Sequence, residues 1–183
     1  MGRFILGTLA LFLSLSLLSG VPPFAQETTE RLIEQGLLLH AIGEYEKAMA
    51  LFKRSIEIRP TAMGHTYLAW SMSHLGRLEE AIEEAKKAIE LDPNFGNPYN
   101  DIGAYLIGLG RLEEAIPYLK KAMVAKNYCC YFFPHFNMGR IHVARGEYGE
   151  ALREFEEALR IEPRYLPARI AIEAIKSYLK ETF

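Results

Sequence analysis

The sequence predicts an all-α protein, an α-solenoid of about four helix pairs with a capping helix at its C-terminal end. Two observations predict this fold: small residues recur four times at fixed spacing, and apolar residues between them follow helical spacing. Composition is consistent with it. Of the 183 residues, 50% are hydrophobic and 24% charged, which is typical of a folded globular chain and fits one domain.

The recurrence begins with four glycines, and successive glycines are 33, 34 and 36 residues apart. Each glycine is followed at fixed offsets by an alanine, then a second small residue, then proline or asparagine. In order, the members are Gly43, Gly76, Gly110 and Gly146; Ala48, Ala81, Ala115 and Ala151; Ser55, Ala88, Ala122 and Ala158; and Pro60, Pro93, Asn127 and Pro163. Recurrence at four offsets predicts four copies of one structural unit.

Each unit is predicted to hold two helices. A glycine just past a helix end can adopt the left-handed conformation that closes the last turn. Proline ends the second helix, because the residue before it avoids helical dihedral angles. Small residues let the two helices approach closely, since a larger side chain there would force them apart. On the first helices these are Gly36, Ala69, Gly103 and Gly139.

A last helix is predicted over residues 167–181. One stripe is expected to face the solenoid, and the opposite stripe is charged. The inward stripe consists of Ile170, Ala174, Ile175 and Tyr178, and the outward stripe of Arg169, Glu173, Lys176 and Lys180. A solenoid needs a terminal cap with a polar outer face, and this helix fits that role.

These features resemble the tetratricopeptide repeat family, with units at about 29–61, 62–95, 96–131 and 132–165. The second unit carries the signature best, at Leu68, Ala69, Gly76, Leu78, Ala81, Ala88 and Pro93. The resemblance implies a right-handed superhelix whose first helices line a concave, peptide-binding face. The third unit departs from the pattern: it lacks the closing proline and gains two residues around 127–131, so we expect a longer connection there.

The N-terminus has a different pattern. Arg3 precedes an apolar run over residues 4–18, followed by Pro22, Pro23 and a small residue, Ala25. This order is typical of a secretory signal peptide. The alternative is a retained membrane anchor over residues 4–21, which at about 1.5 Å per residue spans a thin bilayer only. Both interpretations make 1–25 a targeting segment and 26–183 the repeat domain in an extracytoplasmic location, secreted or periplasmic and possibly anchored to a membrane.

No sequence motif for catalysis, phosphate binding or haem attachment is present. A net charge of −2 and a pI of about 6.2 argue against a nucleic-acid partner. Cys129 and Cys130 lie near His135 and His142, but the two histidines are two helical turns apart, which is poor spacing for a metal. We expect no enzyme, cofactor or metal. The cysteines remain open to three interpretations: apolar fillers, a strained vicinal disulfide, or a thiol that bridges to a partner.

The candidate binding surface is the inner face of the first helices, assigned by position within each unit as the resemblance implies. It is apolar and aromatic, with a few amides and little charge. Its members are Ile33, Leu37 and His40; Met63, Thr66, Trp70 and Ser73; Asn97, Asn100, Asp101 and Ala104; and Phe133, Phe136, Asn137 and Arg140. Trp70 is equally compatible with packing against the neighbouring first helix.

The sequence therefore predicts a non-enzymatic protein–protein interaction module that binds another protein through a short peptide or helix in a concave groove. Two alternatives remain. One is a self-assembling structural solenoid, and the other is a redox or metal-carrying accessory that uses Cys129 and Cys130.

Overall fold

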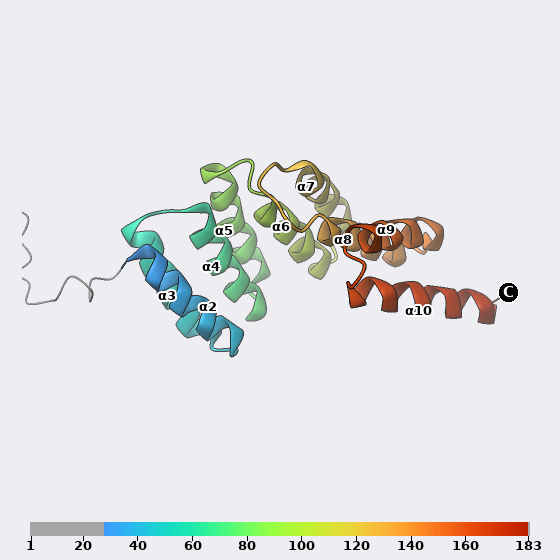
Figure 1. Ribbon diagram of the computed structural model, residues 1–183, viewed down its shortest axis with the longest axis horizontal. Coiled ribbons are helices and arrows are strands. Elements are labelled where there is room, and N and C mark those ends of the chain that lie inside the picture. The colour runs from blue at the N-terminus through green and yellow to red at the C-terminus, as the bar shows by residue number, and fades with distance from the viewer. Residues whose placement is uncertain (1–27, 183) are drawn as a thin grey trace, which may run out of the picture.

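The computed structural model describes residues 28–182, which form nine helices and no β-strand. Figure 1 shows them stacked into one elongated, curved array. The helices are α2 (Thr29–Ala41), α3 (Tyr45–Ile58), α4 (Ala62–His74), α5 (Leu78–Leu91), α6 (Gly96–Gly108), α7 (Leu112–Val124), α8 (Phe132–Ala144), α9 (Tyr148–Ile161) and α10 (Leu166–Thr182). The all-helical solenoid predicted from the sequence is confirmed.

Helices pair in chain order, α2 with α3, α4 with α5, α6 with α7 and α8 with α9. The first helices also contact one another across units, α2 with α4, α4 with α6 and α6 with α8. The second helices chiefly contact the helices before and after them. A stack whose first helices lie closer together than its second helices curves around the first helices. The first helices therefore line the inner face.

The four predicted turn glycines all have positive φ, from 74° to 83°. At the end of α4, the backbone N–H of Gly76 donates to Ser73 O and that of Arg77 donates to Met72 O, both at 3.0 Å. These bonds satisfy carbonyls that the helix itself leaves free. The sequence prediction that glycine closes each first helix is confirmed.

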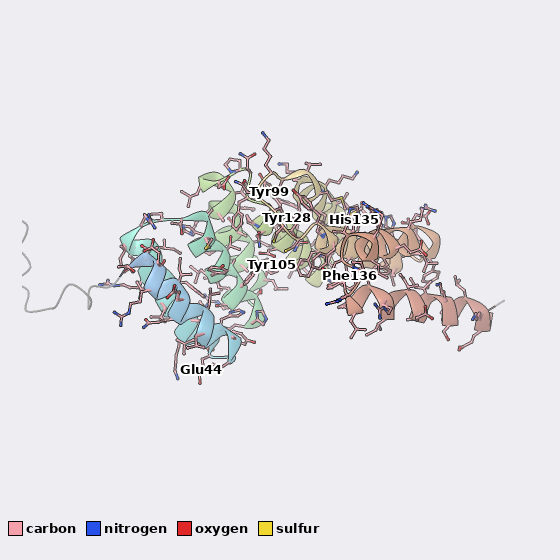
Figure 2. The ribbon with its side chains drawn as sticks, viewed as in Figure 1. Glu44, Tyr99, Tyr105, Tyr128, His135 and Phe136 are labelled. Carbon is pink, nitrogen blue, oxygen red and sulfur yellow. The ribbon has the colours of Figure 1, made fainter. Side chains whose placement is uncertain are left out.

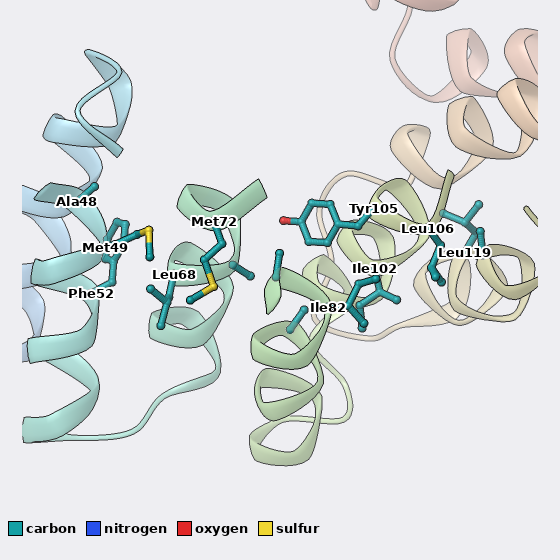
Figure 3. Close-up of a cluster of buried hydrophobic side chains, with 14 of the residues drawn as sticks. Ala48, Met49, Phe52, Leu68, Met72, Ile82, Ile102, Tyr105, Leu106 and Leu119 are labelled. Atoms are coloured by element: carbon teal, nitrogen blue, oxygen red, sulfur yellow. The ribbon is translucent and has the colours of Figure 1, made fainter. Parts of the chain in front are cut away.

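The core runs through the stack between the two helix layers (Figure 3). Within a unit, the glycine of the first helix receives a large side chain from the second. A Cβ atom on Gly36 would lie 2.5 Å from Phe52, on Gly103 2.4 Å from Leu119, and on Gly139 2.4 Å from Phe155. These separations are far below van der Waals contact, so glycine at these positions sets the spacing of the helix pair.

The connection between α7 and α8, residues 125–131, is longer than the other inter-unit connections, as predicted. It lies against the preceding connection, where the N–H of Gly96 donates to Asn127 O at 3.1 Å and the N–H of Asn127 donates to Asn94 O at 2.9 Å. Tyr128 is buried against Gly96, close to Tyr99 in Figure 2. The two extra residues therefore form an ordered contact between units three and four.

Helix α10 stands where the first helix of a fifth unit would stand, one repeat period after α8. Its charged stripe, Arg169, Glu173, Lys176 and Lys180, is exposed, as expected of a cap. The predicted inward stripe is right at two positions and wrong at two. Ile175 is buried, and the Tyr178 ring, although 49% exposed, packs on Tyr148 of α9 at 5.2 Å between ring centres. Ile170 is 60% exposed and Ala174 is also exposed.

The residues of α10 that pack against the solenoid are Ala168, Ile172 and Ile175. The reason for the difference is geometric. Each first helix packs with one apolar stripe on the second helix of the preceding unit, and a neighbouring apolar stripe faces the inner side of the stack. The sequence of α10 alone does not distinguish the two stripes; an alignment of α10 with the earlier first helices does.

The predicted signal peptide or anchor over 1–25 lies outside the described residues. Within 28–182, no helix combines the length and apolarity needed to cross a bilayer.

Candidate binding surface on the inner face

Three of the predicted groove residues are well exposed. Met63 on α4 is 47% exposed, Phe133 on α8 is 36% exposed, and Arg140 on α8 is also exposed. Trp70, Ser73, Asn97, Asp101, Ala104 and Phe136 are half-buried, as are Ile33, Leu37 and His40 on α2. Most of the predicted set is thus at least partly accessible.

Three predicted residues are buried. Thr66 is 1% exposed, and its hydroxyl donates to the backbone carbonyl of Ala62 at 2.8 Å, within its own helix. Asn100 and Asn137 are 8% and 5% exposed. Their position within the repeat predicted an accessible surface, but neighbouring first helices approach closely enough to cover these side chains. Thr66 is therefore removed from the candidate contact surface.

The two asparagines belong to a polar ladder across α4, α6 and α8. The indole N–H of Trp70 donates to Asp101 Oδ2 at 2.6 Å, and Asn100 Nδ2 donates to Asp101 Oδ1 at 3.4 Å. Asn137 Nδ2 donates to Asn100 Oδ1 at 3.0 Å, and Arg140 Nη1 donates to Asn137 Oδ1 at 3.0 Å. The polar ladder fixes three first helices relative to one another.

Asp101 is the buried acid of this ladder. The residue is only partly covered, but its carboxyl group is deeply buried, and this burial raises its pKa to about 7. The hydrogen bonds from Trp70 and Asn100 oppose the rise, because they favour the charged form. Burial is also the main cause of the raised pKa values of Tyr105 and Tyr128, to which the Asp101 charge adds.

The hydroxyls of Tyr105 and Tyr128 are buried without a hydrogen-bond partner within residues 28–182. In Figure 3 the Tyr105 ring reaches from α6 toward α4, the helix of Met72.

An aromatic cluster covers the C-terminal part of the face, and we define it as Phe132, Phe133, Phe136 and Tyr165. The Tyr165 ring centre lies 4.8 Å from that of Phe132, 5.6 Å from that of Phe133 and 5.2 Å from that of Phe136. Figure 2 shows Phe136 near the start of α10. Phe136 also packs on Phe155, at 5.4 Å between ring centres. It is thus partly core and partly surface.

Sequence reasoning missed two parts of this surface. Tyr165 was overlooked because it lies in the connection before α10. Ile170 was assigned to packing, although it is 60% exposed. Counting one 34-residue period on from Phe136 gives Ile170 and would have placed it with the predicted surface residues.

Cys129 is exposed and Cys130 is half-buried in the α7–α8 connection, and both are free thiols. Burial and the adjacent Cys129 raise the pKa of Cys130 to about 11. Its thiol is therefore protonated at neutral pH, and a protonated thiol is a poor nucleophile and metal ligand. Within 28–182 no three metal-binding side chains come together.

Family models described as "Tetratricopeptide repeat" match residues 30–61, 62–95, 84–116 and 132–165. The chain belongs to the tetratricopeptide repeat family. The matched segments cover most of α2 to α9, and the inner face just described is the first-helix face of these repeats.

Solved structures share the fold. PilF from Pseudomonas aeruginosa is 24% identical with a TM-score of 0.76, over 84% of this chain and 69% of that one. PilW, titled a widely conserved type IV pilus biogenesis factor, is 20% identical with a TM-score of 0.71, over 79% of this chain and 66% of that one. YrrB, titled a repeat protein with an unusual peptide-binding site, is 21% identical with a TM-score of 0.59, over 81% of this chain and 76% of that one.

Curated relatives match only in part. The Arabidopsis thaliana TPR repeat-containing thioredoxin TTL4 is 28% identical over 82 residues, which is 44% of this chain and 12% of that protein. Saccharomyces cerevisiae heat shock protein STI1 is 31% identical over 84 residues, which is 45% of this chain and 14% of that protein. The chain thus matches a small fraction of the length of these relatives.

Proposed function

We propose that this protein is a non-enzymatic adaptor in an extracytoplasmic compartment and that it holds a segment of another protein on the inner face of its solenoid. The observation that carries the proposal is that the first helices α4 and α8 present exposed apolar side chains, Met63 and Phe133, and an exposed cation, Arg140, while the polar ladder fixes these helices relative to one another. A preformed surface of this kind binds a segment with little loss of its own conformational freedom.

The surface favours an apolar segment that carries one carboxylate. Met63, Phe133 and Ile170 offer exposed apolar area, and burial of such area at a partner supplies most of the binding free energy. Arg140 is the exposed cation among them. Arg77 and Arg111 are paired with Glu80 and Glu114, whereas Arg140 donates to an amide oxygen, that of Asn137. Its guanidinium therefore has donors available for a partner's carboxylate.

The extracytoplasmic setting is supported by the sequence alone, through Arg3, the apolar run over 4–18 and Ala25. Among proteins of the same fold, PilW is named a pilus biogenesis factor, and RPAP3 is titled as bound to an HSP90 peptide. Both names agree with a protein partner.

Self-assembly is the less favoured function. The stripe of α10 that would receive the next second helix is charged and exposed at Arg169, Glu173 and Lys176. A continuing stack would bury these charges without partners, which is unfavourable. Light scattering at two concentrations distinguishes a monomeric adaptor from a self-assembling solenoid.

The proposal is tested by capture of partners from an envelope extract, followed by mass spectrometry. Phe133→Ser and Arg140→Glu should each reduce capture of the same partner about tenfold or more, because they alter the surface that we propose to be central. Val124→Ser, at a 78% exposed position on α7, and Lys120→Glu are the matched controls and should leave capture unchanged. An equal loss of capture in the control variants would place the binding surface elsewhere.

The extracytoplasmic setting is tested separately, by fusing the chain to a phosphatase that is active only outside the cytoplasm. An inactive fusion would contradict that setting.

A further inference from the structure

Two histidines from consecutive units meet at the N-terminal end of the inner face. His40 is in the last turn of α2, and His74 is the last residue of α4, 34 residues later in the chain and one residue beyond Ser73, the repeat equivalent of His40. Their ring centres are 4.8 Å apart. Tyr45, the first residue of α3, stacks on His74 at 4.7 Å and meets His40 edge-on at 5.1 Å. The stacking of units thus produces a cluster that no local sequence motif encodes.

Each of these histidines uses its Nδ1 atom in the protein. His74 Nδ1 lies 2.9 Å from the backbone carbonyl of Trp70, which can only accept, so this nitrogen carries the proton. His40 Nδ1 lies 3.0 Å from Ser71 Oγ. An imidazole held through one nitrogen by a carbonyl or hydroxyl presents the other as a ligand, which is the usual arrangement of metal-bound histidine.

The other three histidines are arranged differently. His65, His135 and His142 each place Nδ1 within 2.6–2.8 Å of a glutamate carboxylate, Glu84, Glu154 and Glu147 respectively. No such carboxylate contact is made by His40 or His74 in residues 28–182.

We propose that His40 and His74 form a two-histidine site for a divalent transition-metal ion such as Cu²⁺ or Zn²⁺. A tetrahedral ion about 2.0–2.1 Å from one nitrogen of each ring holds the two ring centres about 5 Å apart, and the observed separation meets this requirement. Imidazole ligands suit these ions, with Cu²⁺ bound more tightly than Zn²⁺. Water completes the coordination, and the ion joins the first unit to the second beside Trp70. This site is independent of the proposed adaptor function.

The sequence offers a direct readout, because Trp70 is the single tryptophan of the chain and its ring lies 6.3 Å from that of His40. The full-length chain is titrated with CuCl₂ while tryptophan emission is recorded, since a paramagnetic ion at this distance quenches indole emission. His40→Gln and His74→Gln should each weaken the apparent affinity about tenfold or more. His135→Gln, which alters a histidine in the fourth unit, is the control and should titrate like the wild type.

A second measurement uses ZnCl₂, which does not quench, and follows the melting temperature by circular dichroism. An ion that binds only the folded chain raises Tm. The wild type and His135→Gln should show this increase, and the other two variants should lose it while keeping the wild-type helical signal without metal. Quenching and a Tm increase that persist unchanged in His40→Gln and His74→Gln would overturn the proposal, as would their absence in the wild type.

Discussion

Replacing the buried acid Asp101 by asparagine should stabilise the protein at alkaline pH. The carboxyl group has a pKa of about 7 in the folded chain, against 3.8 for the unfolded reference. The folded state therefore holds a proton that the unfolded state has already lost between about pH 4 and pH 7. Stability falls as pH rises through this window and is constant with respect to this group above it.

The magnitude follows from the difference between the two pKa values. At about 1.4 kcal/mol per pKa unit, a difference of about three units costs about 4 kcal/mol, and relaxation around the charge reduces this to about 2–4 kcal/mol. Asp101→Asn cannot ionise and retains a side-chain oxygen for the Trp70 indole N–H, now at 2.6 Å from Asp101 Oδ2. The variant gives up the weak 3.4 Å contact with Asn100, because an NH₂ group replaces the second oxygen.

The assay is urea unfolding of wild type and variant from pH 5 to pH 8.5, followed by circular dichroism. Asp101→Asn should gain stability relative to wild type as pH rises, with the full difference of about 2–4 kcal/mol near pH 8. Glu90→Gln, at an exposed position on α5, is the control and should show no such trend. A wild-type-to-variant difference that is independent of pH would refute the burial argument.

Three further predictions concern the fold. Gly110→Val should destabilise by at least about 1 kcal/mol, because φ is 74° there; an unchanged Tm would contradict this. Gly103→Val should cost about 1–3 kcal/mol or more, because its Cβ would lie 2.4 Å from Leu119, and normal unfolding in urea would count against that packing. Deleting 167–183 should expose Phe155 and cause aggregation, whereas a monomeric truncation by light scattering would show that α10 is dispensable.

Much of the fold was predictable because repeats place the same physical requirement at the same offset. The turn glycines had to reach positive φ, and the helix-face glycines had to admit Phe52, Leu119 or Phe155. The first requirement leaves glycine in all four units, and the second leaves glycine in three units and alanine, at Ala69, in the other. The longer α7–α8 connection was predictable for the same reason, since the inserted residues break the spacing.

The sequence predicted which residues belong to the candidate surface, but not how exposed each side chain is. Met63 and Thr66 are both first-helix inner positions of one unit, yet one is 47% and the other 1% exposed. Exposure depends on how closely α4 approaches α2 and α6, and helix separation is set by side chains from several units. The polar ladder and the His40–His74 pair join residues about one period or more apart, so neither has a local sequence pattern.

The inner stripe of α10 was wrong for a related reason. Ile170 and Ile172 are both apolar, yet Ile172 packs against the solenoid and Ile170 is exposed, and only an alignment with the earlier units distinguishes the two positions. Because α10 was interpreted as a separate cap, it was not aligned with the first helices of the repeats.

The central claim is that the inner face, and not the outer face, binds a partner protein. The most direct measurement is site-specific photo-crosslinking in living cells, with a photoreactive amino acid at Met63, Phe133 or Ile170 on the inner face and at Lys120 or Val124 on α7. The account predicts that the inner positions crosslink to one common partner and that the α7 positions do not. Crosslinks to a partner from the α7 positions alone would contradict it.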